Sequence, residues 1–444
     1  MSALAPAGLS QLVAALMARL TACYALALSS RVNAGSDTTA ATGGPADVKA
    51  PQCRTLFVDD DPATYLSGGS RVGRDAAGNG SFTGLFRPGA TGVIWDQGAL
   101  QFYRPNGDMV VSYRTLDTVG GIAYDTLVVR EVGGTLKLIG NQYVYSSSVR
   151  AAVQERDFIN APSNTYLNVG YDISIANQTD SNGAPTFTKV EVTTPDNSVL
   201  TLVPTVGNNG LRIRKPDGSV TGTSIIRLNA AYRNSAAAGS PTTSSENLYY
   251  VSPPQTDAQI GATPDQGVWK LEFFHADTTK ANVIQTHRTL TRAYTLAEAS
   301  QVTFAKLTPT MRAFLQNLTA GSGRIVFTTP PSASAPNAVA WGTPQVNAWD
   351  LPPLAVIPVS FSIYGTAPTV NGVAGAAFDD TTSLAASART AYVTCTKATN
   401  ADAHCDTTTG VTQFATGTSF NYVQLIGRSR LGMEHFSGVA LYTP

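Results

Sequence analysis

Short runs with strand-like composition, separated by turn sequences, recur along this 444-residue chain. In the clearest case the runs 99–103 and 109–115 lie on either side of Asn106-Gly107. Asn-Gly favours a tight hairpin because both residues tolerate positive φ. The runs 124–132 and 135–145 repeat the design around Gly133-Gly134. The chain is therefore predicted to be mainly β and to begin with an antiparallel meander domain.

Later strands have the spacing of a β-sandwich. Turn sequences such as 195–198 and 215–219 separate them at intervals of about 8–12 residues, which is typical of sandwiches. The predicted strands of this middle part are 171–175, 188–193, 199–203, 211–214, 224–228 and 268–274. Prolines at 330–336 and 352–353 indicate a boundary, and the strands predicted after it are 357–364, 390–395, 420–428 and 434–442.

The two closing strands resemble the last hairpin of immunoglobulin and fibronectin type III modules. That resemblance implies an immunoglobulin-like sandwich of the kind used in adhesive and structural proteins, and it specifies the fold more than the function.

One helical passage is expected near 295–319. Thr295 and Glu298 have the spacing of a capping box, and Thr308-Pro309 places a cap before a proline at the first helical position. Apolar residues then follow at helical spacing. They are Met311, Phe314, Leu315 and Leu318. We expect this apolar face to cover a sheet rather than to bind a partner.

The amino-terminal segment has the parts of a secretory signal. Arg19 precedes an apolar run from Leu20 to Leu28, and small residues follow as far as Ala34. The segment Leu20-Thr-Ala-Cys23 also resembles the lipobox of bacterial lipoproteins, which implies lipidation of Cys23. Cleavage after Ala34 and an apolar helix of a cytoplasmic protein remain alternatives. Either processing route gives an exported product: periplasmic, anchored to the outer membrane or extracellular in a bacterium.

These signals divide the chain into five parts. The predicted parts are a signal peptide (1–34), a flexible linker (35–52), an antiparallel β domain (53–161), a sandwich with the helical segment (162–330) and an immunoglobulin-like sandwich (331–444).

Cysteine positions agree with export. Cys395 and Cys405 fall in a region read as two strands joined by a loop, where a disulfide is expected, with two free thiols as the alternative. Cys53 has no partner in this scheme, so it is buried or linked to another chain. The cysteines and the four histidines have no zinc-binding spacing, so no metal site is predicted from them.

Composition and motifs exclude several functions. Only 14% of the residues are charged, against about 25% in typical soluble proteins, and the net charge is zero. Without a basic stripe a nucleic-acid partner is not expected. Beyond the signal no apolar run approaches the roughly 18 residues that span a bilayer. No phosphate-binding loop or His-Glu-x-x-His is present, and Gly427 to Gly432 is one residue too long for a hydrolase elbow. We therefore expect no cofactor and no catalytic residue.

Two candidate sites lie in the first β domain. Asp59–Asp61 and Asp75–Asn79 offer oxygens for a cation, but Ala77 and Phe86 occupy positions at which a calcium loop needs ligands, so a plain turn is the alternative. Aromatic side chains give the second candidate, a pocket for a small ligand or sugar, with a simple sheet core as the alternative. They are Trp95, Tyr103, Tyr113 and Tyr143.

The run 135–143, Thr-Leu-Lys-Leu-Ile-Gly-Asn-Gln-Tyr, resembles the closing strands of NTF2-like and cystatin-like sheets. That resemblance implies a concave sheet. The family pattern also has an amphipathic helix before the sheet. None is predicted in this sequence, where a glycine-rich stretch at 67–92 stands in its place.

These observations favour an exported structural or adhesive protein without catalytic activity, similar to uncharacterised bacterial lipoproteins with immunoglobulin-like modules. Its partner would be a protein or glycan at the cell envelope, and its only membrane contact the lipid on Cys23. The alternative is a small-ligand or carbohydrate-binding protein that uses a pocket in the first β domain. A hydrolase with an unrecognised site is the third reading.

Overall fold

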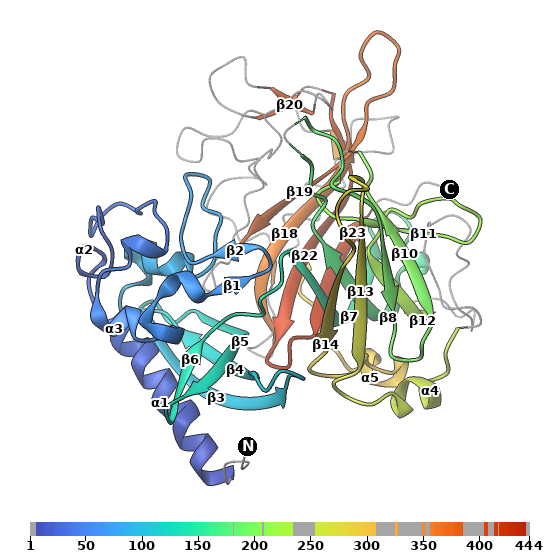
Figure 1. Cartoon of the computed structure of the whole chain (residues 1–444). Coiled ribbons are helices and arrows are strands. Elements are labelled where there is room, and N and C mark those ends of the chain that lie inside the picture. Colours follow the sequence, from blue (N-terminus) through green and yellow to red (C-terminus); the bar gives the residue numbers. More distant parts are fainter. Residues whose placement is uncertain are drawn as a thin grey trace. The chain divides into compact units, whose positions relative to one another are not determined.

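Strands make up most of the regular structure, which confirms the predicted mainly β fold class (Figure 1). This computed structural model describes residues 6–180, 182–206, 208–233, 254–307, 325–326, 349–350, 356–384, 404–406, 413–415 and 417–440. The chain divides into two compact units, residues 1–147 and 148–444, and each is described by itself. No helix of the described residues is long and apolar enough to cross a membrane.

Unit 1 is built on an antiparallel meander, as predicted. Its sheet has the order β3-β4-β5-β6, and the turn at Asn106-Gly107 joins the first two strands, with Gly107 at a φ of 85°. The four strands are β3 (Ile94–Tyr103), β4 (Met109–Leu116), β5 (Ile122–Val132) and β6 (Thr135–Leu138).

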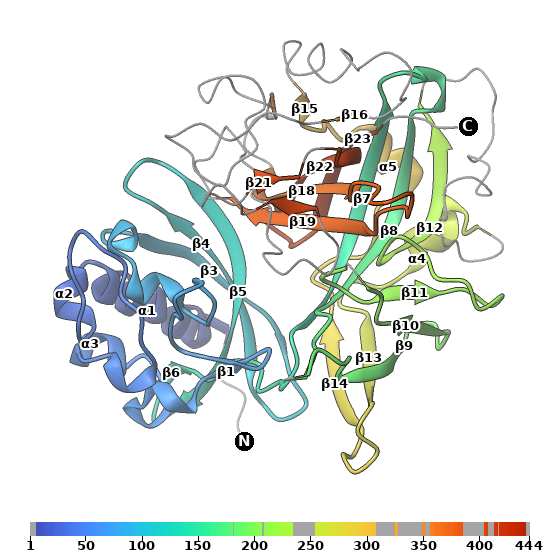
Figure 2. The ribbon, with the colours of Figure 1, turned by 90° about the horizontal axis from the view of Figure 1, so that it is seen from above.

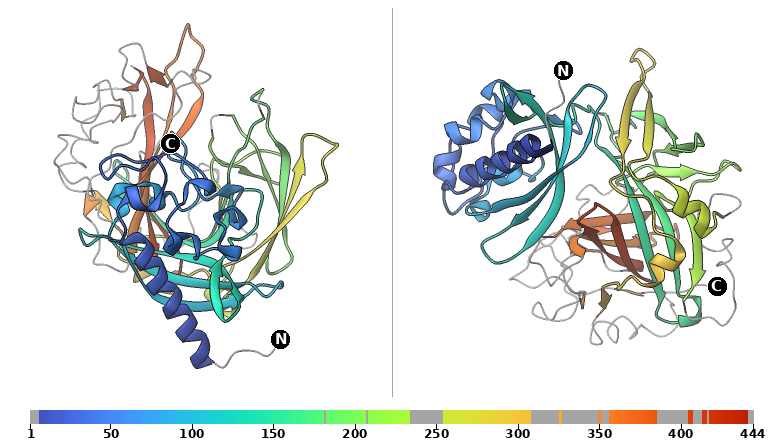
Figure 3. Two further views of the ribbon diagram at one scale, coloured as in Figure 1. Left: turned by 60° about the vertical axis from the view of Figure 1, so that its left-hand side comes forward. Right: turned by 90° about the horizontal axis from the view of Figure 1, so that it is seen from below.

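A 19-residue helix, α1 (Pro6–Tyr24), lies against one face of this sheet (Figures 2 and 3). Its contact with β3 is close because a Cβ on Gly98 would lie 2.6 Å from Cγ1 of Val13, so only glycine fits there. Thr21 adds a polar anchor, since the Trp95 backbone nitrogen donates to its Oγ1 at 2.9 Å. The buried side chains of the helix are Leu9, Val13, Leu16, Met17, Leu20, Cys23 and Tyr24.

This helix corrects two predictions. The apolar run read as a detachable signal peptide over 1–34 is part of the core of unit 1, and Leu20 and Leu28 are fully buried within it. The helix expected from the NTF2-like and cystatin-like resemblance, and judged absent, does precede the sheet. Its buried side chains form one stripe, but the exposed face carries alanines such as Ala14, Ala18 and Ala22 instead of charged residues, so the sequence shows little contrast between the two faces.

The segment 35–52 is also folded, which contradicts the predicted flexible linker. The backbone nitrogen of Ala41 donates to the carbonyl of Phe86 at 2.9 Å, and Val48 is fully buried. Small side chains let this segment pack without regular structure. The short elements of unit 1 are α2 (Leu28–Arg31), η1 (Pro45–Asp47), α3 (Pro51–Arg54), η2 (Val58–Asp60), η3 (Pro62–Thr64), β1 (Leu66–Ser67), β2 (Ser70–Arg71), η4 (Thr83–Phe86) and η5 (Pro88–Ala90).

A disulfide between Cys23 and Cys53 joins α1 to α3, with the two Cα atoms 5.0 Å apart. Both cysteines are fully buried. The bond corrects the prediction that Cys53 has no partner, and it contradicts lipidation of Cys23, because a sulfur in a disulfide cannot carry a thioether. Cys405 is also disulfide-bonded. Its predicted partner Cys395 lies outside the described residues, so that pairing stays a prediction.

Unit 2 contains a sheet of eight described strands in the order β12-β8-β7-β23-β22-β18-β19, with β16 also paired to β22. Strands β7 and β23 pair in parallel, and the pairs β12–β8, β23–β22, β22–β18 and β18–β19 are antiparallel (Figure 1). The strands are β7 (Ser147–Phe158), β8 (Tyr166–Ile175), β12 (Ile225–Tyr232), β16 (Ile325–Val326), β18 (Val356–Thr366), β19 (Ala377–Ser383), β22 (Ser419–Ser429) and β23 (Glu434–Ala440).

This sheet contradicts the predicted boundaries near 161 and 331, because its strands come from all three predicted β domains. A second sheet has the order β11-β10-β9-β13-β14. Its strands are β9 (Phe187–Thr193), β10 (Val199–Val203), β11 (Arg212–Arg214), β13 (Val268–His275) and β14 (Val283–Arg288).

Short elements complete unit 2. They are η6 (Pro162–Asn164), α4 (Asp257–Ala262), α5 (Leu296–Ser300), β15 (Lys306–Leu307) paired with β17 (Trp349–Asp350), and β20 (Cys405–Asp406) paired with β21 (Gln413–Phe414). The capping box at Thr295 and Glu298 is confirmed at the start of α5. The predicted continuation of this helical segment, with Met311, Phe314, Leu315 and Leu318, lies outside the described residues.

Candidate functional site

The four predicted pocket aromatics of unit 1 do not share one environment. Trp95 and Tyr113 pack together with ring centroids 4.6 Å apart, and Tyr24 of α1 lies 5.4 Å from Trp95. Tyr103 is 50% exposed, and the Tyr143 ring lies 5.0 Å from the guanidinium of Arg104. The structure therefore brings two of the four together inside the core between helix and sheet. Ligand binding by these residues stays a prediction.

The carboxylates of the predicted cation sites are already engaged by protein groups. Asn79 donates to Asp75 from its backbone and its side chain, at 2.8 and 3.0 Å, and these bonds hold the pKa of Asp75 below its usual value. Asp60 forms an ion pair with Lys137 at 2.6 Å, and Asp61 caps η3 by accepting from Ala63. Within the part of the chain that the structure describes, no cluster of metal-ligating residues is present. Both segments therefore have the contacts of ordinary turns.

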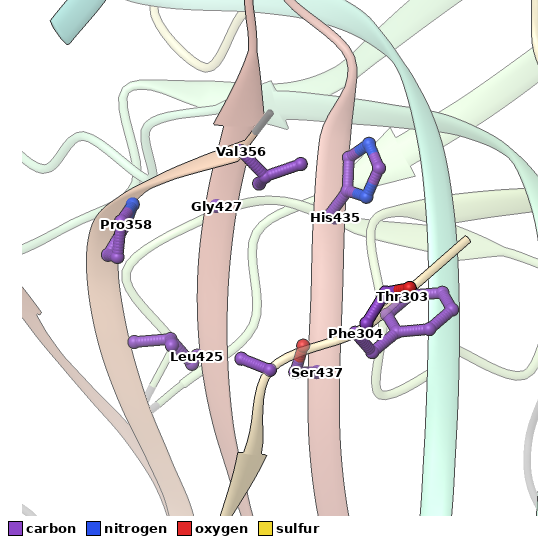
Figure 4. A pocket seen from close by; sticks show the side chains of 9 residues that line it. Thr303, Phe304, Val356, Pro358, Leu425, Gly427, His435 and Ser437 are labelled. Carbon is purple, nitrogen blue, oxygen red and sulfur yellow. The ribbon is translucent and has the colours of Figure 1, made fainter. Parts of the chain in front are cut away.

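An apolar pocket with a cavity volume of about 10 Å³, room for about one water molecule, lies on one face of the eight-stranded sheet in unit 2 (Figure 4). His435 of β23 is its one titratable side chain, opposite Gly427 of β22 in the ladder. A Cβ on Gly427 would lie 2.4 Å from Cγ1 of Val356, so glycine is required at this crossing. The pocket is lined by Thr303, Phe304, Ala305, Val356, Pro358, Leu425, Gly427, His435 and Ser437.

His435 is 6% exposed, and neither ring nitrogen has a hydrogen-bond partner. Its neighbours are the rings of Tyr294 and Phe304, each with its centroid 6.2 Å away. Burial among these groups lowers the pKa of His435 to about 4. The imidazole is therefore neutral at pH 7. It can donate one hydrogen bond and accept another, but no side chain orients it as a catalytic base.

The opposite face of this sheet carries a chain of hydrogen bonds between side chains, which we call the polar network. Gln154 of β7 accepts from Arg227 at 2.9 Å and from Asn168 at 2.8 Å, and its own amide donates to the Tyr422 hydroxyl at 2.8 Å. Beyond Tyr422 the chain continues through Gln424 of β22 to Tyr364 of β18. The bonds cross from β12 to β18, and Arg227, Gln154, Asn168 and Gln424 are all buried.

Gly438 of β23 makes this crossing possible. A Cβ at that position would lie 2.0 Å from the Tyr422 hydroxyl oxygen. Since β23 lies between β22 and β7, Tyr422 reaches Gln154 only by passing over the bare glycine backbone. Any larger residue would push Tyr422 away and break the network.

A pair of carboxyl groups, Asp172 of β8 and Glu434 of β23, also lies on the network face. Burial, and next the charge of Glu434, raise the pKa of Asp172 to about 7. Ser224 donates to Asp172 at 2.6 Å, and Arg428 donates to Glu434 at 3.0 Å. Asp172 therefore holds a proton at pH values at which an ordinary aspartate has lost it.

Further buried charges in unit 2 are matched by partners. His404 and Asp380 are fully buried and bonded at 3.1 Å, and the Phe378 ring stacks on the imidazole at 4.1 Å. Arg212 of β11 pairs with Asp379 of β19. These contacts, the network and the His435 pocket were all missed by the sequence analysis. The only sequence signal in β7 was the polar run 154–157, which has the composition of a solvent-facing strand end.

Comparison of the chain with protein-family models and with curated proteins found no match.

Proposed function

We propose that this chain is an exported bacterial protein with a structural or adhesive role at the cell envelope and no catalytic activity. The observation that carries the proposal is the buried disulfide between Cys23 and Cys53, together with the disulfide of Cys405. Structural disulfides form and persist in oxidising compartments such as the periplasm and the cell exterior. This support for export does not depend on a signal peptide.

The arrangement of titratable groups supports a non-catalytic role. Asp380 bonds to His404 and Asp379 pairs with Arg212, so these buried charges are compensated within the protein. His435 faces the pocket of unit 2, but it lacks both a nucleophile and an orienting acid within hydrogen-bond distance. Catalytic constellations require such partners in contact.

The proposed partner is a protein or a glycan of the envelope. Two resemblances support the class of protein without identifying the partner. A helix on a four-stranded antiparallel sheet in unit 1 agrees with the resemblance to NTF2-like and cystatin-like sheets, and the β22–β23 hairpin has the position that the immunoglobulin-like resemblance gives to its last two strands.

The test begins with the native host. Cells are fractionated, and the recovered protein is digested with trypsin without reduction. Export predicts recovery outside the cytosol and a linked pair of peptides, 20–31 with 50–54, since Arg19, Arg31, Lys49 and Arg54 bound them. A strain lacking the protein should then attach less well to surfaces or become sensitive to detergent. Recovery from the cytosol with free thiols, or turnover of ester or glycoside substrates, would contradict the proposal.

A further inference from the structure

Arg227 of β12 is fully buried but has one hydrogen-bond partner. Its Nη2 donates to Gln154 at 2.9 Å, while Nε and Nη1 have no acceptor. A guanidinium stays charged at every pH that proteins experience. Burying it with most of its donors unmatched is expensive, because both the charge and the N–H groups lose water without replacement. Such a group is expected to meet an acceptor that comes from outside the chain.

A second guanidinium lies beside it. Arg156 of β7 and Arg227 lie 5.9 and 5.7 Å from the Tyr166 ring centroid, and Arg156 lies 4.7 Å from the ring of Tyr422. Burial raises the pKa of Tyr422, while the two guanidinium charges act in the opposite direction, so both act on the same phenol. Two guanidinium groups therefore lie close to the Tyr166 and Tyr422 rings.

No carboxylate of the described residues forms an ion pair with Arg227. Asp172 and Glu434 lie on the same face, but they bond to each other and to Ser224 and Arg428. Glu155, next to Gln154 in β7, pairs with Arg233 at 2.6 Å and with Lys306. Since successive strand residues point to opposite faces, Glu155 lies on the other side of the sheet.

We infer that Arg227 binds a small oxyanion, a carboxylate or phosphate group, on the network face of the eight-stranded sheet. The anion accepts from Nε and Nη1 of Arg227 at the buried end of the site. Arg156 and Tyr422 are only partly buried, so they form the open side of the site. Charge-assisted hydrogen bonds of this kind are about twice as strong as neutral ones. This inference goes beyond the proposed envelope role and does not depend on it.

The test uses the full-length protein and its Arg227→Met variant. Melting of unit 2 is followed in sodium phosphate, sodium acetate and sodium chloride at equal ionic strength. The wild type should melt about 2 °C or more higher in phosphate or acetate than in chloride, and the variant should lose that difference. The phosphate and acetate arms separate the two anion chemistries.

The matched control is Arg31→Met in unit 1. Arg31 is also fully buried, but its Nη1 and Nη2 donate to the carbonyls of Tyr24 and Arg87. This variant should keep the anion difference of the wild type. Comparing Arg227→Met with Arg31→Met separates the loss of anion binding from the general stabilisation that phosphate gives to any protein.

A second variant covers the case in which Arg227→Met does not fold. Gln154→Glu places a carboxylate beside Nη2 of Arg227, so the protein supplies its own anion. The variant should fold, and it should lose the response to phosphate and acetate. The inference is overturned if Gln154→Glu or Arg227→Met responds as the wild type does, or if the wild type melts equally in all three salts.

Discussion

His435 and Asp172 give unit 2 two opposite dependences of stability on pH. Burial lowers the pKa of His435 to about 4, so between pH 4 and 6.5 the unfolded chain binds a proton that the folded chain does not. This makes stability increase as pH rises. Burial raises the pKa of Asp172 to about 7, so from pH 3.8 to 7 the folded chain holds a proton that the unfolded chain has lost. This makes stability decrease as pH rises.

The two effects nearly cancel in the wild type. Each contributes a slope of about 1.4 kcal/mol per pH unit, which amounts to about 3 kcal/mol for His435 and about 4 kcal/mol for Asp172 over their full ranges. His435→Leu removes the first effect, so the free energy of unfolding of this variant, measured relative to the wild type, should fall as the pH rises from 4 to 6.5. Asp172→Asn removes the second effect, so the free energy of unfolding of this variant, measured relative to the wild type, should rise as the pH rises over the same range.

The assay is urea unfolding of the full-length protein at pH 4, 5, 6 and 7, followed by tryptophan fluorescence. Comparison with the wild type at each pH removes the contributions of all other titrating groups. The double variant is the control, because it should run parallel to the wild type between pH 4 and 6.5. If both single variants also run parallel to the wild type, the two side chains do not titrate as the structure indicates, and the reasoning is refuted.

Two further predictions concern packing. Replacing Cys23 and Cys53 by alanine opens a loop with a sequence separation of 30 residues, and the chain-entropy relation gives a loss of about 3.6 kcal/mol. Hydrogen exchange should show this loss in unit 1 peptides, and Cys405→Ala should leave those peptides unchanged. Gly438→Ala should destabilise unit 2 by about 1–3 kcal/mol, because its Cβ would overlap the Tyr422 hydroxyl. Gly222→Ala is the control, because its surroundings are open and its φ is not positive, and equal losses in the two variants would contradict the overlap argument.

Local signals made much of the secondary structure predictable. The Asn106-Gly107 turn and the alternation in the runs beside it gave β3 and β4, and the run 199–203 coincides with β10. A hairpin depends on residues that are close in sequence, so its pattern is visible there. Helix α1 was misread for a related reason. A helix with leucines on its buried face and alanines on its exposed face has the same composition as the apolar core of a signal peptide.

The candidate site was not predictable in the same way. Gln154 and Tyr422 are bonded across a separation of 268 residues, and nothing near either residue indicates the other. Towards the end of β7, Gln154 and Arg156 on the network face lie next to the charged residues Glu155 and Asp157 in the sequence, a composition that is typical of exposed residues. The polar network buries much of that face, so the polar residues in the sequence did not indicate contact with solvent.

The parallel pairing of β7 with β23 also predicts that unit 2 completes its fold later than unit 1. In unit 1 the helix, the disulfide and the four strands all lie within residues 1–147, so their contacts can form as soon as that part of the chain emerges. The central strand pair of unit 2 joins Glu434 to Ala152, and the network needs Tyr422 over Gly438. Contacts between such distant residues close late and slowly. Residues 331–444 therefore do not form a separate sandwich. One edge of β23 pairs with β22, and its other edge pairs with β7, which lies at the opposite end of the unit's sequence.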